Sequence, residues 1–330
     1  MALIRYGILG AGRIAEKFAK TIQAGLTREV RLLGAASGEA ARSREFAEKY
    51  GLPRGYAGYG ELLADPDIDI VYIANLNDMH AESIGMCIDA GKPVLCEKPM
   101  FLRADEAEGL IRRAEKAGVF LMEAMWTRFT PAFRKALEWA ESGRIGRLRC
   151  VSASYCGARD PAEYARLYDP ARYGGAMYDL GVYGIQLAQI FARGHVPQDA
   201  RAVFVPSGTG VDEAAFIHMV YDGGLVAEIK CAIGWDARND AMIYGDKGYI
   251  RIAPCFNAAQ KVEIYAPPFP ADDSLEPAVP LEVFTKESPS GMEYEIDHAA
   301  RCVRDGLRES QVMPPAESLE IARLFETLSA

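Results

Sequence analysis

The first part of the chain alternates short apolar runs with amphipathic segments, a pattern that predicts parallel strands joined by helices. Strands are expected at residues 3–9, 30–36, 68–74, 94–96 and 119–123. Helical spacing is clearest over 79–90 and 104–117, and a glycine follows each of these segments. Because the strand segments are apolar on both faces, we expect helices to cover the sheet on both sides. This pattern is typical of a doubly wound parallel sheet.

The pattern changes in the second half, where strands follow one another without helices between them. They are expected at 148–155, 202–206, 214–221, 225–233, 241–244, 248–252, 262–265 and 281–285. Asp222-Gly223-Gly224 and Asp246-Lys247-Gly248 are typical hairpin turns, so the sheet should be largely antiparallel. Alternation of apolar and polar residues over 216–230 predicts two unlike faces, one of which stays open unless a second subunit covers it.

The predicted fold class is therefore α/β, with an N-terminal Rossmann sheet and a C-terminal α+β domain that holds a large, mostly antiparallel open sheet. We place the dinucleotide-binding domain at 1–123 and the substrate-binding and dimerisation domain at 124–330. Residues 267–289 form a proline-rich loop around the strand at 281–285, and helices at 293–307 and 317–328 close the chain. The last helix can pack back on the first domain.

Composition narrows the classes of partner. The 330 residues carry a formal net charge of −9, which argues against nucleic acid and membrane surfaces because both are anionic. No apolar run approaches the about 20 residues of a membrane span. The start, from Met1 to Gly7, leads directly into a strand, so a cytoplasmic protein without a secretory signal is expected. The seven cysteines are widely spaced and predict neither a disulfide framework nor a metal site.

The first strand leads into Gly10-Ala11-Gly12-Arg13-Ile14-Ala15 and a helical pattern, the strand, turn and helix of a dinucleotide fingerprint. Gly10 allows a tight turn and Gly12 lets the backbone approach a pyrophosphate at the helix N-terminus. We therefore expect Gly10, Gly12, Arg13 and Ile14 to contact the cofactor.

The end of the second strand bears on the choice of cofactor. An NAD site usually has Asp or Glu there to bind the ribose 2′-hydroxyl, and this chain has Ala35-Ala36-Ser37. Ser37 can donate to a 2′-phosphate and Arg42 can reach it from the next helix, so NADP(H) is favoured over NAD(H). Glu39 nearby would repel a phosphate and weakens that preference.

Polar residues also follow the later strands, at the sheet edge where ligands bind. Asn75, Asn77 and His80 follow one strand and are either cofactor contacts or turn and helix-cap residues. Glu97 and Lys98 follow the next strand, and Pro99 holds Lys98 in extended geometry. We count all five polar residues as candidate cofactor contacts, with Lys98 also catalytic.

The second half supplies further candidates. Trp126 and Arg128 follow a sheet strand and are further candidate cofactor contacts. Trp126 is either a domain-junction anchor or a pocket wall. Gly174-Gly175-Ala176 opens a helix on which Asp179 and Tyr183 share a face. A carboxylate in an apolar helix needs a cation, and Lys98 is the proposed partner. Trp126, Tyr155 and Phe256 can line an aromatic substrate pocket.

These motifs, with Glu97-Lys98-Pro99, Glu123-Ala124-Met125-Trp126-Thr127-Arg128-Phe129 and Gly291-Met292-x-Tyr294-Glu295, resemble the Gfo/Idh/MocA oxidoreductases. The resemblance covers essentially the whole chain and is closest to the dimeric dihydrodiol dehydrogenase branch, which includes NADP-dependent D-xylose dehydrogenases. It implies a cis peptide before Pro99, contact of Lys98 with cofactor and substrate, Asp179 near it, and a part for residue 183 in proton transfer. The open face of the second sheet predicts a homodimer formed through that sheet. This chain departs from the pattern at Asn75-Leu76-Asn77, where relatives have Thr-Pro-Asn.

The expected reaction is hydride transfer between nicotinamide C4 and a secondary alcohol of a sugar, polyol or cyclic trans-diol. Tyr183 is the candidate base, because a neighbouring ammonium favours phenolate over the phenol, whose ordinary pKa is about 10. Lys98 is the competing proton donor. A non-catalytic dinucleotide or sugar sensor is the alternative of a different class, and the sequence does not choose between xylose-like sugars and dihydrodiols.

Overall fold

The computed structural model describes residues 3–267 and 279–329, so residues 268–278 of the proline-rich loop predicted at 267–289 lie outside the described residues. The chain forms two compact units. Unit 1 comprises Met1–Trp126 and Pro289–Arg323, and unit 2 comprises Thr127–Ser288 and Leu324–Ala330. The chain passes from unit 1 to unit 2 after Trp126, and the last helix contributes residues to both.

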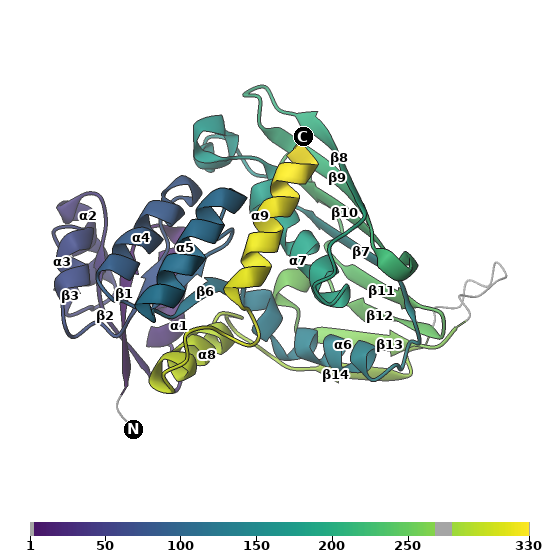
Figure 1. Ribbon diagram of the computed structural model, residues 1–330, viewed down its shortest axis with the longest axis horizontal. Helices are drawn as coiled ribbons and strands as arrows, with labels where there is room; N and C mark the ends of the chain where they lie inside the picture. Colours follow the sequence, from purple (N-terminus) through teal and green to yellow (C-terminus); the bar gives the residue numbers. More distant parts are fainter. Residues whose placement is uncertain (1–2, 268–278, 330) are drawn as a thin grey trace. The chain divides into compact units, whose positions relative to one another are not determined.

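Unit 1 is built on a six-stranded parallel sheet with the order β3-β2-β1-β4-β5-β6 (Figure 1). Its strands are β1 (Ile4–Leu9), β2 (Val30–Ala36), β3 (Arg54–Gly55), β4 (Ile70–Ile73), β5 (Val94–Glu97) and β6 (Leu121–Ala124). Its helices are α1 (Arg13–Gln23), α2 (Ala40–Lys49), α3 (Tyr59–Ala64), α4 (His80–Asp89), α5 (Ala104–Ala117), α8 (Glu293–Arg304) and the first part of α9 (Pro315–Ser329). This strand order is that of the dinucleotide-binding fold, and it places a topological switch point between β1 and β4.

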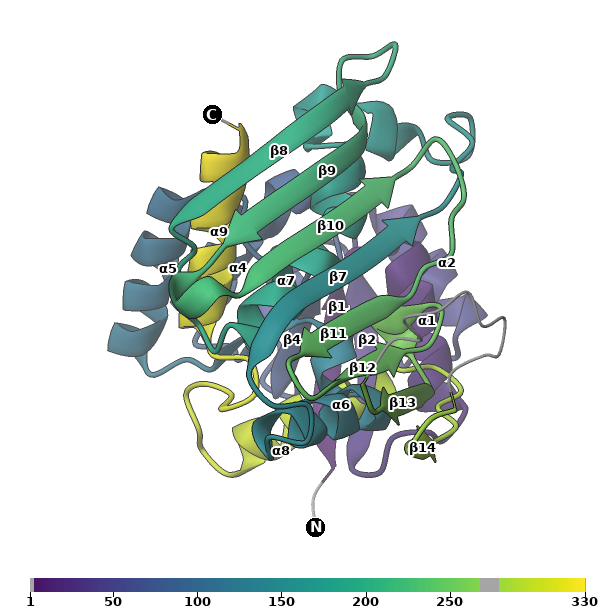
Figure 2. The same cartoon turned by 90° about the vertical axis from the view of Figure 1, so that its right-hand side faces the viewer.

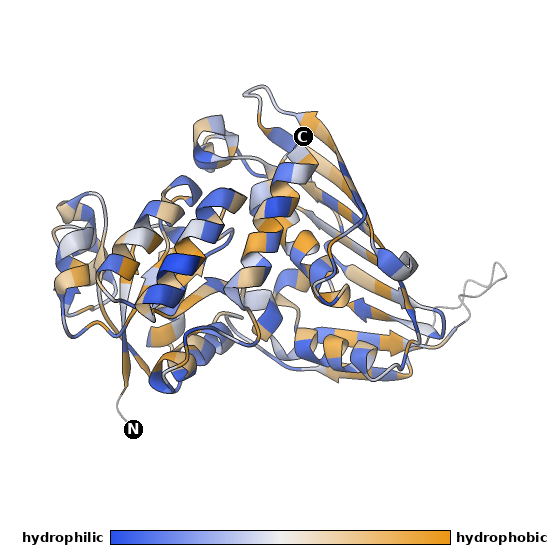
Figure 3. Cartoon of the chain, in the orientation of Figure 1, coloured by the Kyte–Doolittle hydropathy of each residue, from blue (hydrophilic) through white to orange (hydrophobic). Residues whose placement is uncertain are grey.

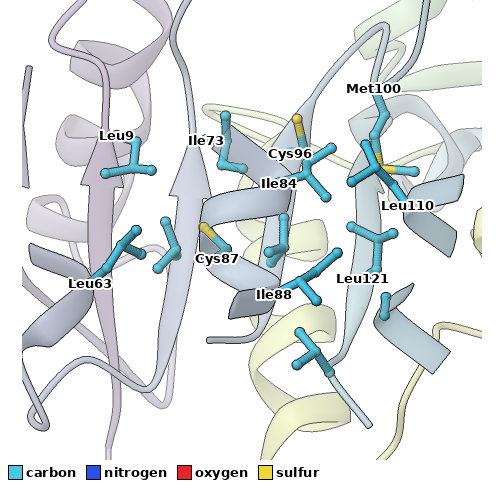
Figure 4. Packing of buried hydrophobic residues seen from close by; sticks show 14 of the residues in the cluster. Leu9, Leu63, Ile73, Ile84, Cys87, Ile88, Cys96, Met100, Leu110 and Leu121 are labelled. Atoms are coloured by element: carbon cyan, nitrogen blue, oxygen red, sulfur yellow. The ribbon is translucent and has the colours of Figure 1, made fainter. Parts of the chain in front are cut away.

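Helices cover both faces of this sheet, as the apolar strands predicted. On one face, α4 and α5 bury Ile84, Cys87, Ile88 and Leu110 against strand residues such as Ile73 (Figure 4). On the other face, the rings of Phe18 in α1 and Tyr72 in β4 stack with centroids 3.9 Å apart. Burial of apolar surface stabilises the fold by about 25 cal/mol per Å². A shift in strand register would expose part of that surface, so the buried sheet fixes where its strand ends lie.

Unit 2 contains an eight-stranded mixed sheet with the order β14-β13-β12-β11-β7-β10-β9-β8 (Figure 2). Its strands are β7 (Leu148–Cys156), β8 (Asp199–Pro206), β9 (Asp212–Val220), β10 (Val226–Ala232), β11 (Ala241–Gly245), β12 (Gly248–Ile252), β13 (Lys261–Tyr265) and β14 (Glu282–Thr285). The prediction of a largely antiparallel sheet is confirmed, with one exception. Strands β7 and β10 pair in parallel, because the chain leaves the sheet after β7 and returns to it through β8 and β9.

Two helices of unit 2 lie on one face of that sheet. Helix α7 (Val182–Phe191) packs on β7 and β10, and α6 (Pro131–Glu141), which the sequence analysis did not identify, packs on β12 and β13. Figure 2 looks onto the opposite face of β8, β9, β10 and β7, over which it shows no helix in the described part of the chain. Colouring by hydropathy shows mixed apolar and polar positions along these strands (Figure 3). The two faces therefore differ as the alternation over 216–230 predicted.

Candidate active site

The turn after β1 has the geometry that a dinucleotide fingerprint requires. Gly10 has φ +104°, and a Cβ there would lie 2.6 Å from the backbone carbonyl carbon of Ala74. Residues 74 and 75 follow β4, so Gly10 lies at the switch point between β1 and β4. Only glycine fits this position without displacing backbone.

Gly12 is the N-cap of α1 and makes no side-chain cap hydrogen bond. A Cβ built on Gly12 would meet no protein atom within 4 Å, so packing within the chain does not explain why the residue is glycine. Close approach of a ligand does explain it, because the first N–H groups of a helix bind phosphate oxygens. Arg13 and Ile14 form the first turn of this helix. The residues present thus fit a dinucleotide pyrophosphate.

The two residues predicted to select NADP differ in exposure and in hydrogen bonding. Arg42 is exposed on α2, whereas Ser37 is 4% exposed. The Ser37 hydroxyl donates to the Glu39 carbonyl at 2.7 Å, and its backbone N–H donates to Ser43 Oγ at 2.8 Å. Ser37 therefore shapes the turn, and its hydroxyl would have to leave Glu39 to donate to a phosphate.

A buried histidine holds the turn that follows β5. His80 is 1% exposed, and its Nδ1 lies 2.9 Å from the Pro99 carbonyl, to which the neutral ring can donate. Burial lowers the pKa of His80 to about 4, so the ring is neutral at pH 7. The Lys98–Pro99 peptide is cis, as the family resemblance implied. His80 thus supports the segment that presents Lys98.

The other polar residues at these strand ends are also tied to the protein. Asn75 donates through Nδ2 to Ser83 Oγ at 2.7 Å, and Asn77 lies in a short 3₁₀ turn over Asn77–Met79. Glu97 is buried, accepts from the Tyr72 hydroxyl, and accepts from the Lys98 backbone N–H at 3.2 Å. Burial raises the pKa of Glu97 even though these bonds favour its ionised form. Glu97 consequently orients the backbone at Lys98.

Trp126, the last residue of the first segment of unit 1, receives a cation on its ring. Lys17 Nζ lies 3.5 Å from the centroid of the Trp126 ring. Burial is the main cause that lowers the pKa of Lys17, and the carboxylates of Glu295 and Glu97 oppose that shift. Lys17 comes from α1, so Trp126 is joined to the helix that begins at the glycine turn.

In unit 2, Asp179 lies in a π-helical turn, Met177–Gly181, which leads directly into α7. Such turns are rare and are frequent at functional sites. Asp179 Oδ1 accepts from Arg166 Nη2 at 3.0 Å, and Arg166 comes from the loop between β7 and α7. The sequence analysis missed Arg166, because nothing in the spacing of an irregular loop indicates which of its arginines faces Asp179.

Tyr183 lies near the start of α7 and is 8% exposed. Its ring centroid is 5.4 Å from that of Tyr155, whose own centroid is 6.1 Å from that of Phe256. The structure therefore brings Tyr155 and Phe256, two of the three residues predicted to line an aromatic pocket, together with Tyr183, the predicted base. Phe256 is fully buried, so it supports Tyr155 from behind. Burial, followed by the charge of Asp179, raises the pKa of Tyr155.

Arg128 is 3% exposed, and its Nη2 donates to Gln186 Oε1 on α7. The sequence analysis counted Arg128 among the cofactor contacts. Gln186 lies three residues after Tyr183 on α7, so Arg128 makes a structural contact with the helix that carries the candidate base.

Two further features of the described residues concern metal binding and membrane spanning. No group of three or more His, Cys, Asp or Glu side chains among them is arranged to hold a metal ion. None of the helices in the described ranges combines the length and the apolar character needed to cross a membrane.

Comparisons with known proteins agree with this geometry. Residues 4–125 match the model of the Gfo/Idh/MocA oxidoreductase family with an NAD-binding Rossmann fold, and residues 133–251 match a Gfo/Idh/MocA C-terminal domain. Trans-1,2-dihydrobenzene-1,2-diol dehydrogenases from Bos taurus and Mus musculus are 32% and 34% identical to this chain. Each alignment covers 98% of this chain and 95% of the relative.

Solved structures are similar over the same extent. KijD10, a 3-ketoreductase from Actinomadura kijaniata in complex with NADP and TDP-benzene, is 26% identical with a TM-score of 0.85, covering 99% of this chain and 97% of KijD10. The aldose-aldose oxidoreductase from Caulobacter crescentus is 24% identical with a TM-score of 0.84, covering 98% and 96%. At that identity the second likeness concerns the fold.

Proposed function

This chain belongs to the Gfo/Idh/MocA family of oxidoreductases, and we propose that it is an NAD(P)-dependent dehydrogenase of a secondary alcohol in a sugar, polyol or cyclic trans-diol. The observation that carries the proposal is the glycine turn between β1 and α1. Gly12 leaves open space at an uncapped helix N-terminus, and the neighbouring strand ends carry Asn75, Glu97 and Lys98. The bound nicotinamide would accept or deliver the hydride at C4.

We assign Lys98 and Tyr183 to the proton that the substrate hydroxyl loses. Tyr183 acts as the base, and a positive charge on Lys98 favours its phenolate. Asp179, held by Arg166, orients the charged groups around the hydroxyl. Tyr155 offers a ring face to the C–H surface of a sugar or diol ring, and Trp126 is the second candidate for this role.

For the cofactor we propose NADP(H), with its 2′-phosphate bound by Arg42 of α2, the helix that follows β2. Support comes from the absence of Asp or Glu from Ala35-Ala36-Ser37 and from KijD10, which was solved with NADP. The Gly10–Ile14 turn binds the pyrophosphate in this proposal, while Asn75, Asn77 and Glu97 lie toward the nicotinamide. His80 is left out of this layer because it is buried and hydrogen-bonds to the Pro99 carbonyl. Arg128 is left out because it is buried and hydrogen-bonds to Gln186 on α7.

The test is oxidation of a panel of pentoses, hexoses and trans-dihydrodiols, followed by NADPH absorbance. Lys98→Met should lower kcat by roughly 1,000-fold, because proton transfer by a positioned group contributes about 100- to 10,000-fold. Its affinity for NADP(H), measured by fluorescence titration, should stay within about twofold. Lys116→Met, on the exposed end of α5, is the matched control. Near-native kcat in Lys98→Met would refute the role assigned to Lys98.

A second variant separates the two candidates for proton transfer. If Tyr183 is the base, kcat of the wild-type protein should increase with pH as the tyrosine loses its proton. Tyr183→Phe should then abolish this increase together with most of the activity. If Lys98 transfers the proton, Tyr183→Phe should retain the shape of the pH profile and lose only part of the rate.

We also propose that two copies of the chain associate through the outer face of the unit 2 sheet. Val203, Phe216 and Val220 are 65%, 37% and 39% exposed there, which is unusual for large apolar residues on neighbouring strands. A hollow of about 470 Å³ on the same face is lined by residues that include Glu228, Asp240, Lys230 and Arg238. Both signs of charge on one face suit a twofold contact, in which each patch meets its own copy.

Light scattering tests this association. We expect a dimer at micromolar concentration and a monomer for Phe216→Glu, since the change replaces an apolar ring with a carboxylate that would lose its hydration in the contact. Leu3→Glu, a change at another exposed apolar residue but in unit 1, should leave the dimer intact. A monomeric wild-type protein would contradict the proposal.

A further inference from the structure

The paired glycines before α7 have separate causes, and one of them is a carboxylate from β9. A Cβ on Gly174 would lie 2.5 Å from the Leu167 carbonyl oxygen, so backbone excludes any side chain at this position. Gly175 has φ +114°, and its missing Cβ leaves room for the carboxylate of Asp212. The sequence analysis singled out the glycine pair but did not identify Asp212.

Asp212 binds the first backbone N–H groups of the helical segment that carries Asp179. Its Oδ2 accepts from the Met177 N–H at 2.7 Å, and the Ala176 N–H also hydrogen-bonds to its carboxylate. These are the orphan donors that every helix start must satisfy. The acceptor belongs to a different element, β9, so it holds the start of the helix to the sheet.

Glycines also seat the rest of this helix on the sheet. A Cβ on Gly181 would lie 3.0 Å from Cys231 Sγ, and one on Gly184 would approach Ile229 Cγ2 at 2.5 Å. Both partners belong to β10. The helix is therefore fixed along its length by close packing and at its start by Asp212, while Asp179 and Tyr183 lie between these supports.

We propose that Asp212 is a positioning residue for the reaction: it holds the π-helical turn so that Asp179 and Tyr183 keep the geometry that hydride and proton transfer require. This inference rests on the proposed function of those two residues. Asp212 acts through the helix and contacts neither substrate nor cofactor in this account. An aspartate suits the position better than an asparagine, because its two oxygens accept from two N–H groups whereas the asparagine amide offers one oxygen.

The surroundings of Asp212 support a role beyond stability. Burial raises the pKa of Asp212 to about 6, although its bonds to backbone N–H groups act in the opposite direction. Its ionised form at pH 7 is therefore held at a cost to the fold. Groups kept at such a cost are found preferentially at functional sites.

The experiment compares Asp212→Asn with Asp246→Asn. Asp246 is a close match, because its Oδ1 also occupies the space beside a positive-φ glycine, Gly146, and accepts from the Arg147 N–H at 3.0 Å. That turn joins β11 to β12 and carries no candidate site residue. Steady-state kinetics and hydrogen exchange of residues 176–183 are measured for wild type and both variants, with the best substrate of the panel.

We expect Asp212→Asn to lower kcat by roughly ten- to a hundredfold, since a displacement of about 1 Å can cost a hundredfold in rate. KM for NADP(H) should change by less than about twofold, and amides 176–179 should exchange about tenfold faster. Asp246→Asn should match wild type in all three. Asp212→Ala should be slower than Asp212→Asn, because alanine offers no acceptor.

Two outcomes would overturn the inference. One is a folded Asp212→Asn whose kcat lies within about twofold of that of Asp246→Asn. The other is a slow Asp212→Asn whose amides 176–179 exchange at the wild-type rate. Failure of the proposed function gives a different result: the wild-type protein then oxidises nothing on the panel, while hydrogen exchange still reports whether Asp212 holds the helix.

Discussion

The two units differ in how they position the groups that we propose take part in the reaction. In unit 1 the sheet is covered on both faces, and the strand-end edge at which we propose that the cofactor binds has a glycine turn with room for a ligand. In unit 2 one sheet face is covered by α6 and α7, and the candidate groups are side chains on a single helix. Backbone positions follow from local sequence, whereas side-chain positions on a helix depend on what holds that helix. We therefore expect the two units to respond differently to pH and to substitution.

The largest expected difference between the two units is in how acidic pH changes their stability. His80 of unit 1 has a pKa of about 4 against its ordinary 6.5, so its contribution to stability is present above pH 6.5 and is lost as the pH falls toward 4. This loss is on the order of 3 kcal/mol. His80→Asn removes the titration and places an amide N–H where Nδ1 was. Its unfolding free energy, relative to wild type, should rise by about that amount from pH 7 to pH 4.

The measurement is hydrogen exchange of α4 amides, which follows unit 1 by itself. His195→Asn, at an exposed position in unit 2, is the control. Asp212 of unit 2 should have the opposite effect on stability. Its pKa is raised to about 6, so its ionisation lowers stability as the pH rises through about 6. Parallel pH dependence of wild type and His80→Asn would contradict the account of His80.

Alanine at the two site glycines gives the next largest effect. In Gly10→Ala the new Cβ meets backbone that cannot move, so dinucleotide affinity should fall by roughly a hundredfold. In Gly175→Ala it meets the Asp212 carboxylate, so kcat should fall by roughly tenfold while dinucleotide affinity is kept.

Fluorescence titration and steady-state kinetics distinguish these results. Gly25→Ala and Gly143→Ala are the controls, because both glycines have positive φ but open space at the Cβ position. Each control should therefore show only the cost of the backbone conformation, about 1 to 2 kcal/mol in stability. If Gly175→Ala weakened dinucleotide binding as much as Gly10→Ala, the division of labour between the units would be wrong.

The smallest effect concerns the 2′-phosphate. Arg42→Ala should raise KM for NADP(H) by up to about fivefold and leave KM for NAD(H) unchanged, since an exposed ion pair contributes about 1 kcal/mol or less. Arg44→Ala, a neighbouring exposed arginine, should change neither. Equal effects of Arg42→Ala on the two cofactors would remove the support for NADP that Arg42 provides.

Unit 1 was predictable because each of its signals is local. Apolar runs long enough for a strand can only be buried, and a glycine fingerprint between a strand and a helix has one common use. The helix expected at 104–117 is α5 with the same bounds. The departures are at element ends, such as 68–74 against β4 (Ile70–Ile73), where hydrogen bonding ends the strand before hydrophobicity does.

Unit 2 was less predictable. Its strands and hairpins were identified, but α6 was missed because the change of pattern near Trp126 was interpreted as a pocket or a junction. The parallel pairing of β7 with β10 is a long-range event, and no local signal indicates it. Arg166 and Asp212 were not predicted either. Arg166 contacts Asp179 and Asp212 contacts the Met177 N–H, and both lie in other segments of the chain, so no local pattern indicates these contacts.

The sequence by itself determined the class of fold, the glycine turn, the family and the side chains that have reactive groups to offer. It could do so because these depend on residue type and on spacing over a few residues. Only the tertiary structure decided which groups are held and by what: His80 by the Pro99 carbonyl, Asp179 by Arg166, and the start of its helix by Asp212. Such contacts join residues far apart in the chain, and their partners are selected by packing of whole elements, which local sequence does not encode.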